Sequence, residues 1–200
     1  MGEIRTRSDC YSQGVPRPID QAKRETLLRD IRTYISDNGL ADLSLRPLAA
    51  ALGTSDRMLI HYFGTKDNLL AQALADQKPA FHLIFDNVDS RPALQSSLRT
   101  LWQSMTSGED VQSVRILLQA MGIACTGPGR FTAYVTTMFD TLTDALTHAI
   151  QRCGSAPEHA RIEATVLAAT FRGLLFDRLI TDDEDRTSAA VERLIHNHAG

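Results

Sequence analysis

Between residues 44 and 66 the sequence gathers hydrogen-bonding side chains whose types suit the recognition of nucleic acid. Arg57 can donate two hydrogen bonds to guanine O6 and N7, and Asp56 can accept one from the cytosine N4 amino group. Ser44 and Lys66 are placed at the starts of helices, where backbone N–H groups and positive charge favour a phosphate. The candidate DNA contacts are Ser44, Thr54, Ser55, Asp56, Arg57, His61, Tyr62 and Lys66. Tyr62 could equally serve the protein core.

Side chains that could support catalysis or bind a metal do not form a recognised motif. The sequence lacks a phosphate-binding loop, a dinucleotide-binding glycine pattern, a zinc-protease motif and a nucleophile elbow. His196 and His198 are two residues apart and lie on different helical faces, which disfavours joint metal ligation. His148 and Cys153 could form a catalytic pair, but a solvated histidine and a small buried cysteine are the commoner arrangement. We therefore predict no enzymatic activity, no cofactor and no metal.

Two short helices joined by a tight turn must hold the candidate DNA contacts in place. Ser44 is a good N-cap for the first helix, and Gly53 ends it. Ser55 then caps a second helix, in which Leu59 and Phe63, four residues apart, face inward. This pattern predicts a helix-turn-helix, whose second helix fits a major groove with its N-terminal half nearest to the base edges.

The same stretch resembles the DNA-binding helix-turn-helix of TetR-family transcriptional regulators. The resemblance is carried by Ser44, Leu48, Ala49, the Gly53-Thr54-Ser55 turn, Leu59, Phe63, Lys66 and Leu69. The sequence departs from the family pattern at Arg57, Met58 and Ile60, where a small residue, a threonine and an aromatic residue are common. These departures concern which bases are read rather than whether DNA is bound.

The rest of the chain predicts an all-α fold, because strand-like alternation is nowhere sustained. Residues 1–18 are predicted to form a disordered arm, 19–66 the helix-turn-helix DNA-binding domain, and 67–200 a helical effector-binding and dimerisation domain. Three short helices followed by about six longer ones is also the TetR-family layout. Thr65 is expected to cap the fourth helix, which Pro79 breaks, and the next helix is expected from Pro92.

Composition is that of an ordinary soluble globular protein, with 43% hydrophobic and 22% charged residues. No apolar run approaches the ~20 residues of a membrane helix, and the N-terminus has no secretory signal. Three cysteines without ligand-like spacing are typical of reduced thiols, which favours a cytoplasmic location. Residues 1–80 hold 11 Lys/Arg against 10 Asp/Glu, whereas residues 81–200 hold 10 against 14. The N-terminal part alone is therefore suited to phosphates, and only mildly.

The helix expected after Pro157 is apolar on two sides, although one protomer offers it a single core. Its first apolar side holds Ile162, Val166, Ala169 and Phe176, and its second holds Leu167, Phe171, Leu174 and Leu175. A surplus apolar side needs a partner, so a two-fold homodimer is predicted through this helix and the last one, as the family resemblance also implies. We assign to the dimer interface Phe171, Leu174, Val191, Leu194 and Ile195.

Methionine and aromatic side chains of the C-terminal region could line an effector cavity. Methionine adapts to irregular cavities, and the cores of helical bundles often hold ligands. The candidate lining residues are Trp102, Met105, Leu118, Met121, Met138, Phe139, Phe171 and Arg172. Such a stripe is more often plain core, and it is the family resemblance that favours a cavity. Thr143, Arg172 and Gln119 are the inward polar candidates.

Two functions from different classes fit these patterns. The first is a ligand-responsive regulator, in the simplest case a repressor, that binds a palindromic double-stranded DNA operator as a homodimer. A small apolar or amphipathic effector would release it, with the fourth helix as the lever. The second is an all-helical small-molecule binding protein or enzyme without a role on DNA. The segment from Ser44 to Leu69 favours the first.

Overall fold

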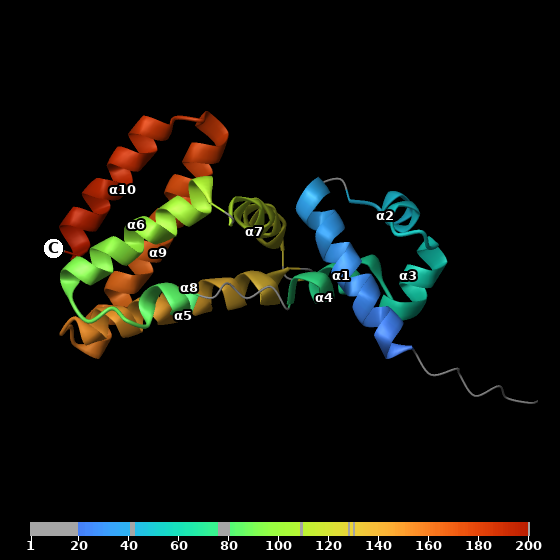
Figure 1. Ribbon diagram of the computed structural model, residues 1–200, viewed down its shortest axis with the longest axis horizontal. Coiled ribbons are helices and arrows are strands. Elements are labelled where there is room, and N and C mark those ends of the chain that lie inside the picture. The colour runs from blue at the N-terminus through green and yellow to red at the C-terminus, as the bar shows by residue number, and fades with distance from the viewer. Residues whose placement is uncertain are drawn as a thin grey trace, which may run out of the picture.

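Ten α-helices make up the part of the chain that the computed structural model describes, which is residues 20–40, 43–75, 81–108, 110–127, 129 and 131–199 (Figure 1). The helices are α1 (Gln21–Asn38), α2 (Leu45–Ala51), α3 (Asp56–Phe63), α4 (Lys66–Ala75), α5 (Phe81–Phe85), α6 (Arg91–Ser107), α7 (Val111–Ala124), α8 (Thr132–Arg152), α9 (Pro157–Thr181) and α10 (Glu184–Ala199). These residues contain no strand, and the predicted all-α fold is confirmed. None of the described helices is long and apolar enough to cross a bilayer. The predicted arm, 1–18, and Pro79 lie outside the described residues.

Helix ends in the N-terminal region follow from the side chains beside them. Asp20, Ser55 and Thr65 cap α1, α3 and α4: each side-chain oxygen accepts a hydrogen bond from the backbone N–H three residues later, at 3.1, 3.2 and 3.1 Å. Gly39 follows the last residue of α1 with φ at 75°, a region that favours glycine. Ser44 occupies the N-cap position of α2, but its hydroxyl makes no capping hydrogen bond.

The N-terminal core is built by α1 to α4 and completed by α7 and the start of α8. Ile31 of α1 and Leu59 of α3 are fully buried in it. The same cluster includes Ile116 of α7, Phe131 just before α8, and Met138 of α8. In Figure 1, α7 lies between the helix-turn-helix and the bundle of α6, α9 and α10. Packing therefore continues across the predicted domain boundary between residues 66 and 67.

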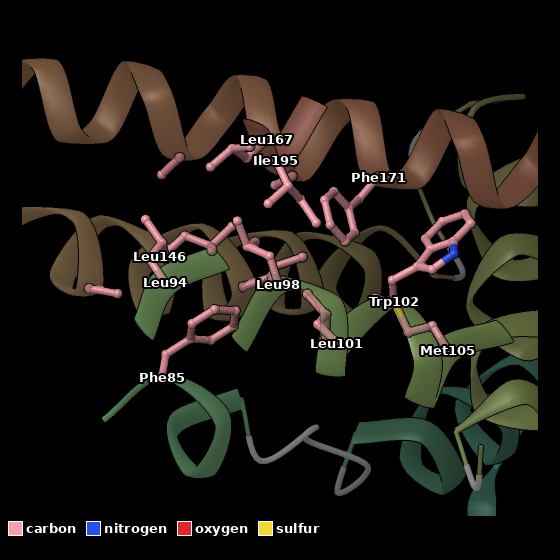
Figure 2. Packing of buried hydrophobic residues seen from close by; sticks show 14 of the residues in the cluster. Phe85, Leu94, Leu98, Leu101, Trp102, Met105, Leu146, Leu167, Phe171 and Ile195 are labelled. Atoms are coloured by element: carbon pink, nitrogen blue, oxygen red, sulfur yellow. The ribbon is translucent and has the colours of Figure 1, made fainter. Parts of the chain in front are cut away.

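The C-terminal core is formed mainly by α6, α8, α9 and α10 (Figure 2). Leu98 and Leu101 of α6 lie in it together with Leu167 of α9 and Ile195 of α10. The rings of Trp102 and Phe171 meet edge to face, with their centroids 5.9 Å apart. This packing decides which side of α9 is buried: Ala160, Ala164, Leu167, Ala168, Phe171 and Leu175.

A short helix, α5, lies where no helix was predicted. Its Phe85 is 1% exposed within the C-terminal core. Arg152 of α8 donates hydrogen bonds to the carbonyl oxygens of Phe85 and Val88, which holds the end of α5 against α8. Five residues span fewer than two helical turns, so the sequence shows no periodic pattern that would predict this helix. Tertiary contacts determine its position.

The turn between α9 and α10 is held by one arginine. Arg186 donates hydrogen bonds to the carboxylate of Asp177, at 2.7 and 2.8 Å, and to that of Asp183, at 2.9 Å. The guanidinium bonds lower the pKa of the Asp177 carboxyl group. The pKa of the Asp183 carboxyl group is lowered first by a hydrogen bond from the Arg186 backbone N–H, at 3.1 Å, and then by the guanidinium bond. The arginine thereby connects the end of α9 to the start of α10.

Candidate nucleic-acid interface and effector cavity

Four side chains form an exposed surface on α3, the α3 outer face (Asp56, Arg57, Ile60 and His61). They lie at positions i, i+1, i+4 and i+5, so they share one side of the helix, opposite the N-terminal core. No hydrogen bond from a described residue engages the Arg57 guanidinium. The Asp56 carboxylate instead accepts a hydrogen bond from the Arg57 backbone N–H at 3.0 Å, within the first helical turn. The predicted base contacts Asp56, Arg57 and His61 are therefore brought together.

Ile60 is a member of the α3 outer face that was not among the predicted contacts. It is 37% exposed, an apolar side chain on an otherwise polar surface. Its departure from the aromatic residue common in the family was the sequence signal that could have singled it out. An exposed apolar side chain beside polar ones can contact the methyl group of thymine.

The other predicted contacts surround this face and partly support it. Tyr62 is half-buried against the N-terminal core, and its ring meets that of His61 edge to face at 5.4 Å. Thr54 is half-buried in the turn, and Ser55 uses its hydroxyl as the cap of α3. Ser44 is exposed at the start of α2.

Lys66 connects the start of α4 to the segment before α2. Its side chain is half-buried, and Nζ donates a hydrogen bond to the carbonyl oxygen of Leu43. An ammonium group has three N–H donors, so this bond leaves two for another acceptor. Lys66 therefore holds the N-terminus of α2 in place while still being able to meet a phosphate.

α7 is hydrogen-bonded to the C-terminal end of α1. Gln112 Nε2 donates to the carbonyl oxygen of Ser36, and Gln119 Oε1 accepts from the Leu40 backbone N–H at 2.7 Å. Gln119 was predicted to face the cavity as a polar ligand contact, but its side chain contacts Leu40, just beyond the end of α1, and does not line the cavity. Two side chains of α7 thus connect the two cores.

An internal cavity of about 40 Å³ lies between α6, α7, α8 and α9, with Phe81 of α5 at its edge. Six of the eight predicted residues line it: Met105, Leu118, Met138, Phe139, Phe171 and Arg172. Trp102 instead packs against Phe171, and Met121 packs against both cores. The cavity is close to the ~30 Å³ share of one water molecule and far below the ~300–1,000 Å³ of typical ligand pockets. It is therefore closed in this conformation.

A second surface runs along α9, the α9 outer stripe (Ile162, Val166, Ala169, Gly173, Phe176 and Ile180), in which every member is exposed except the half-buried Phe176. Its members follow one another at alternating spacings of four and three residues, which keeps them in one line along a helix. Ile162, Val166 and Ile180 are 59, 41 and 78% exposed. A Cβ placed on Gly173 would have no atom within 4 Å, so the space in front of the stripe is open.

The predicted dimer interface uses the opposite side of α9 together with α10, and it needs correction. Phe171, Val191 and Ile195 are at most 1% exposed and belong to the C-terminal core, so they offer no surface to a second copy. Leu174 and Leu194 are half-buried against the same core. The side of α9 that the prediction gave to the partner is the side that the protomer itself uses.

Comparisons with known proteins agree with the helix-turn-helix. Residues 27–73 match the family described as "Bacterial regulatory proteins, tetR family". This segment of the chain is a TetR-family DNA-binding segment. A segment of 56 residues is 36% identical to the HTH-type transcriptional regulator BetI of Stenotrophomonas maltophilia (strain R551-3). That match spans 28% of this chain and 29% of the length of BetI.

Solved structures share the TetR-family fold along most of the chain. A transcriptional regulator from Rhodococcus sp. Rha1 has a TM-score of 0.68 at 21% identity, covering 88% of this chain and 95% of its own. A TetR transcriptional regulator from Legionella pneumophila has a TM-score of 0.63 at 12% identity, covering 92% and 98%. The multidrug binding protein EbrR, complexed with proflavin, has a TM-score of 0.63 at 20% identity, covering 86% and 99%. At such identities the likeness concerns the fold.

The match of the N-terminal segment to the TetR family bears on the class of protein as well. Regulators of this family are not enzymes, so the alternative of a helical enzyme is set aside. In the part of the chain that the structure describes, no group of three or more His, Cys, Asp or Glu side chains could hold a metal ion.

Proposed function

We propose that this chain is a cytoplasmic transcriptional repressor that binds a palindromic DNA operator as a homodimer and is released by a small effector. The observation that carries the proposal is the α3 outer face, with Arg57 and His61 exposed on the second helix of a TetR-family helix-turn-helix. The major groove of B-DNA is wide enough for an α-helix, and a recognition helix presents its first residues to base edges.

The α9 outer stripe is the proposed dimer seam. A line of apolar residues at spacings of four and three packs against the same line of a second helix. Ala169 and Gly173 are small and lie near its middle, so the two backbones can approach closely there. A two-fold contact uses the same patch on both copies. Such a dimer would present two α3 outer faces to half-sites one helical turn apart, ~34–36 Å.

The internal cavity is the proposed effector site, and α7 the element that couples it to DNA. Val114, Leu117 and Leu118 of α7 line the cavity, while Gln112 and Gln119 are bonded to α1. A ligand that enlarges the cavity and displaces α7 would favour a dimer whose helix-turn-helix units no longer match the operator. The fold likeness to a multidrug binding protein complexed with proflavin supports a small-molecule effector.

Selection of duplexes from a random-sequence pool tests the DNA-binding proposal. The full-length protein is incubated with the pool at low and at moderate salt, and bound duplexes are sequenced and titrated in a mobility-shift assay. We expect a palindromic site that retains two protomers and whose affinity falls steeply with salt. A protein that retains no duplex at low salt, or retains all sequences with equal affinity, contradicts the proposal.

Replacing Lys66 with methionine is expected to weaken binding to all operator sequences alike. The variant keeps the aliphatic stem and removes one proposed phosphate contact, so the slope of log K against log salt should become shallower by about 0.9. Titrations of the selected duplex at several salt concentrations measure this slope. An unchanged slope together with a lower melting temperature would limit Lys66 to its hydrogen bond with Leu43.

Gln119→Leu is expected to reduce the response to an effector while leaving the operator affinity of the free protein within a few-fold. The variant loses the hydrogen bond to Leu40 and leaves the α3 outer face untouched. For a ligand that releases the wild type, the ratio of operator affinities without and with ligand should approach one. Gln103→Leu, at an exposed position of α6, is the matched control. An unchanged ratio of operator affinities in Gln119→Leu would indicate that another element, such as α4, couples the cavity to the DNA-binding helices.

A further inference from the structure

Arg172 is the one charged residue among the described side chains that line the internal cavity. The other ten lining residues are hydrophobic. The Arg172 guanidinium lies over the Phe139 ring, with Cζ 4.0 Å from the ring centroid. The side chain is half-buried, and this burial lowers its pKa. In the described part of the chain no carboxylate forms an ion pair with it, so the cavity wall carries a partly desolvated positive charge without a counter-charge.

The geometry of this arginine leaves its hydrogen-bond donors available. Arg172 Cζ lies over the Phe139 ring, and no described residue accepts a hydrogen bond from the guanidinium N–H groups, which lie in the plane of the group. Those N–H groups match the two oxygens of a carboxylate, and such charge-assisted pairs are about twice as strong as neutral hydrogen bonds. Desolvation beside an apolar cavity strengthens the attraction further.

A groove of about 260 Å³ on the protomer surface lies beside the same wall, and Phe176 and Ile180 of the α9 outer stripe line it, so in the proposed dimer it borders the seam. Leu118 lines both the groove and the cavity, so the two are separated by its side chain. Arg115 lines the groove, and no acidic residue is found among the described residues that line either space. An anion in this groove therefore contacts Arg115 and no carboxylate among the described lining residues.

We propose that the effector is an apolar carboxylic acid, whose hydrocarbon or aryl body occupies the cavity once it has widened and whose carboxylate pairs with Arg172. This inference rests on the cavity being the effector site, as proposed above. A neutral ligand would leave the guanidinium unpaired, and a cationic one would be repelled by it. Met105 and Met138 line the cavity, and their flexible side chains can move to make room for the ligand.

Calorimetric titration of the full-length protein with matched compounds tests the proposal. The probes are decanoate, decanamide and decylammonium, used below their micelle concentrations, and 4-phenylbutyrate with its amide; proflavin serves as a cationic dye. We expect the acids to bind at least about tenfold more tightly than their amides, ~1.4 kcal/mol. Arg172→Gln should bind acids and amides alike, Arg172→Lys should keep part of the preference, and Arg161→Gln, an exposed arginine on the same helix, should keep all of it.

Several outcomes would overturn the inference. If amides or cations bind the wild type as tightly as the acids, the proposed pairing of a carboxylate with Arg172 is contradicted. It is also contradicted if no acid binds up to millimolar concentration. An unchanged preference in Arg172→Gln removes the role of Arg172. This variant is expected to fold, because it loses a charge that burial disfavours, and its melting temperature is measured alongside. Failure of the regulator proposal is seen separately, when the wild type retains no DNA, or binds acids without any change in operator affinity.

Discussion

Glutamate in place of Val166 is expected to convert the proposed dimer into monomers and to abolish tight operator binding. Val166 lies in the α9 outer stripe and is 41% exposed. In a two-fold seam the substitution places a carboxylate from each copy in an apolar contact without a positive partner, which costs far more than one surface charge. A monomer engages one half-site, so operator affinity should fall by about 10²–10⁴-fold.

Light scattering behind size-exclusion chromatography gives the mass, and mobility-shift titration gives the operator affinity. Because Val166 lies outside the protomer core, the variant should keep the helical circular dichroism of the wild type. Ser96→Glu, at an exposed position of α6, introduces the same charge elsewhere and should leave the dimer intact. Dimers that persist in Val166→Glu at micromolar concentration would place the interface on another surface.

Loss of the Arg57 guanidinium is expected to erase the preference for one base of each half-site. Arg57 is exposed on the α3 outer face, and a guanidinium that pairs with guanine O6 and N7 discriminates against other bases by about 1–3 kcal/mol. Arg57→Ala should therefore bind the selected operator and its single-base variants at that position with similar affinity. Titration of these duplexes at one salt concentration measures the effect.

Arg57→Lys separates the reading of a base from the contribution of charge. Lysine keeps the positive charge but not the planar pair of donors, so this variant should keep the salt dependence and lose most of the base preference. Arg29→Ala, an exposed arginine of α1, is a second control and should keep the preference. Equal losses on every duplex from Arg57→Ala would assign Arg57 to the phosphate backbone instead.

The helix-turn-helix could be predicted from the sequence because its signals are local. Asp20, Ser55 and Thr65 cap helices through hydrogen bonds to backbone N–H groups three residues later. These bonds do not depend on how distant segments pack, because both partners lie in the same short stretch of sequence. The inward positions Leu59 and Phe63 follow from one helical turn. The TetR family could be recognised for the same reason, since the pattern lies within residues 44–69.

Side chains that link distant segments could not be assigned in this way. Gln112 and Gln119 contact the end of α1 across more than seventy residues of sequence, and α5 is too short to have a period. Lys66 was predicted from its place at a helix start, yet its bond to Leu43 depends on how α4 packs beside the start of α2. Such contacts arise from packing between elements, about which helical periodicity says nothing.

The sequence by itself determined that α9 has two apolar sides and that one of them faces away from the protomer core. Helical periodicity does not show which apolar side faces the protomer core, because the apolar residues of both sides repeat at helical spacing. Only the tertiary structure decided between them: α6, α8 and α10 enclose the side of Leu167 and Phe171, where Trp102 meets the phenylalanine ring edge to face. A close-packed core needs large side chains such as Leu167 and Phe171, whereas a side centred on Ala169 and Gly173 would leave voids in it. The outer stripe thus remained open on the surface, whereas Phe171, Val191 and Ile195 of the predicted interface were buried.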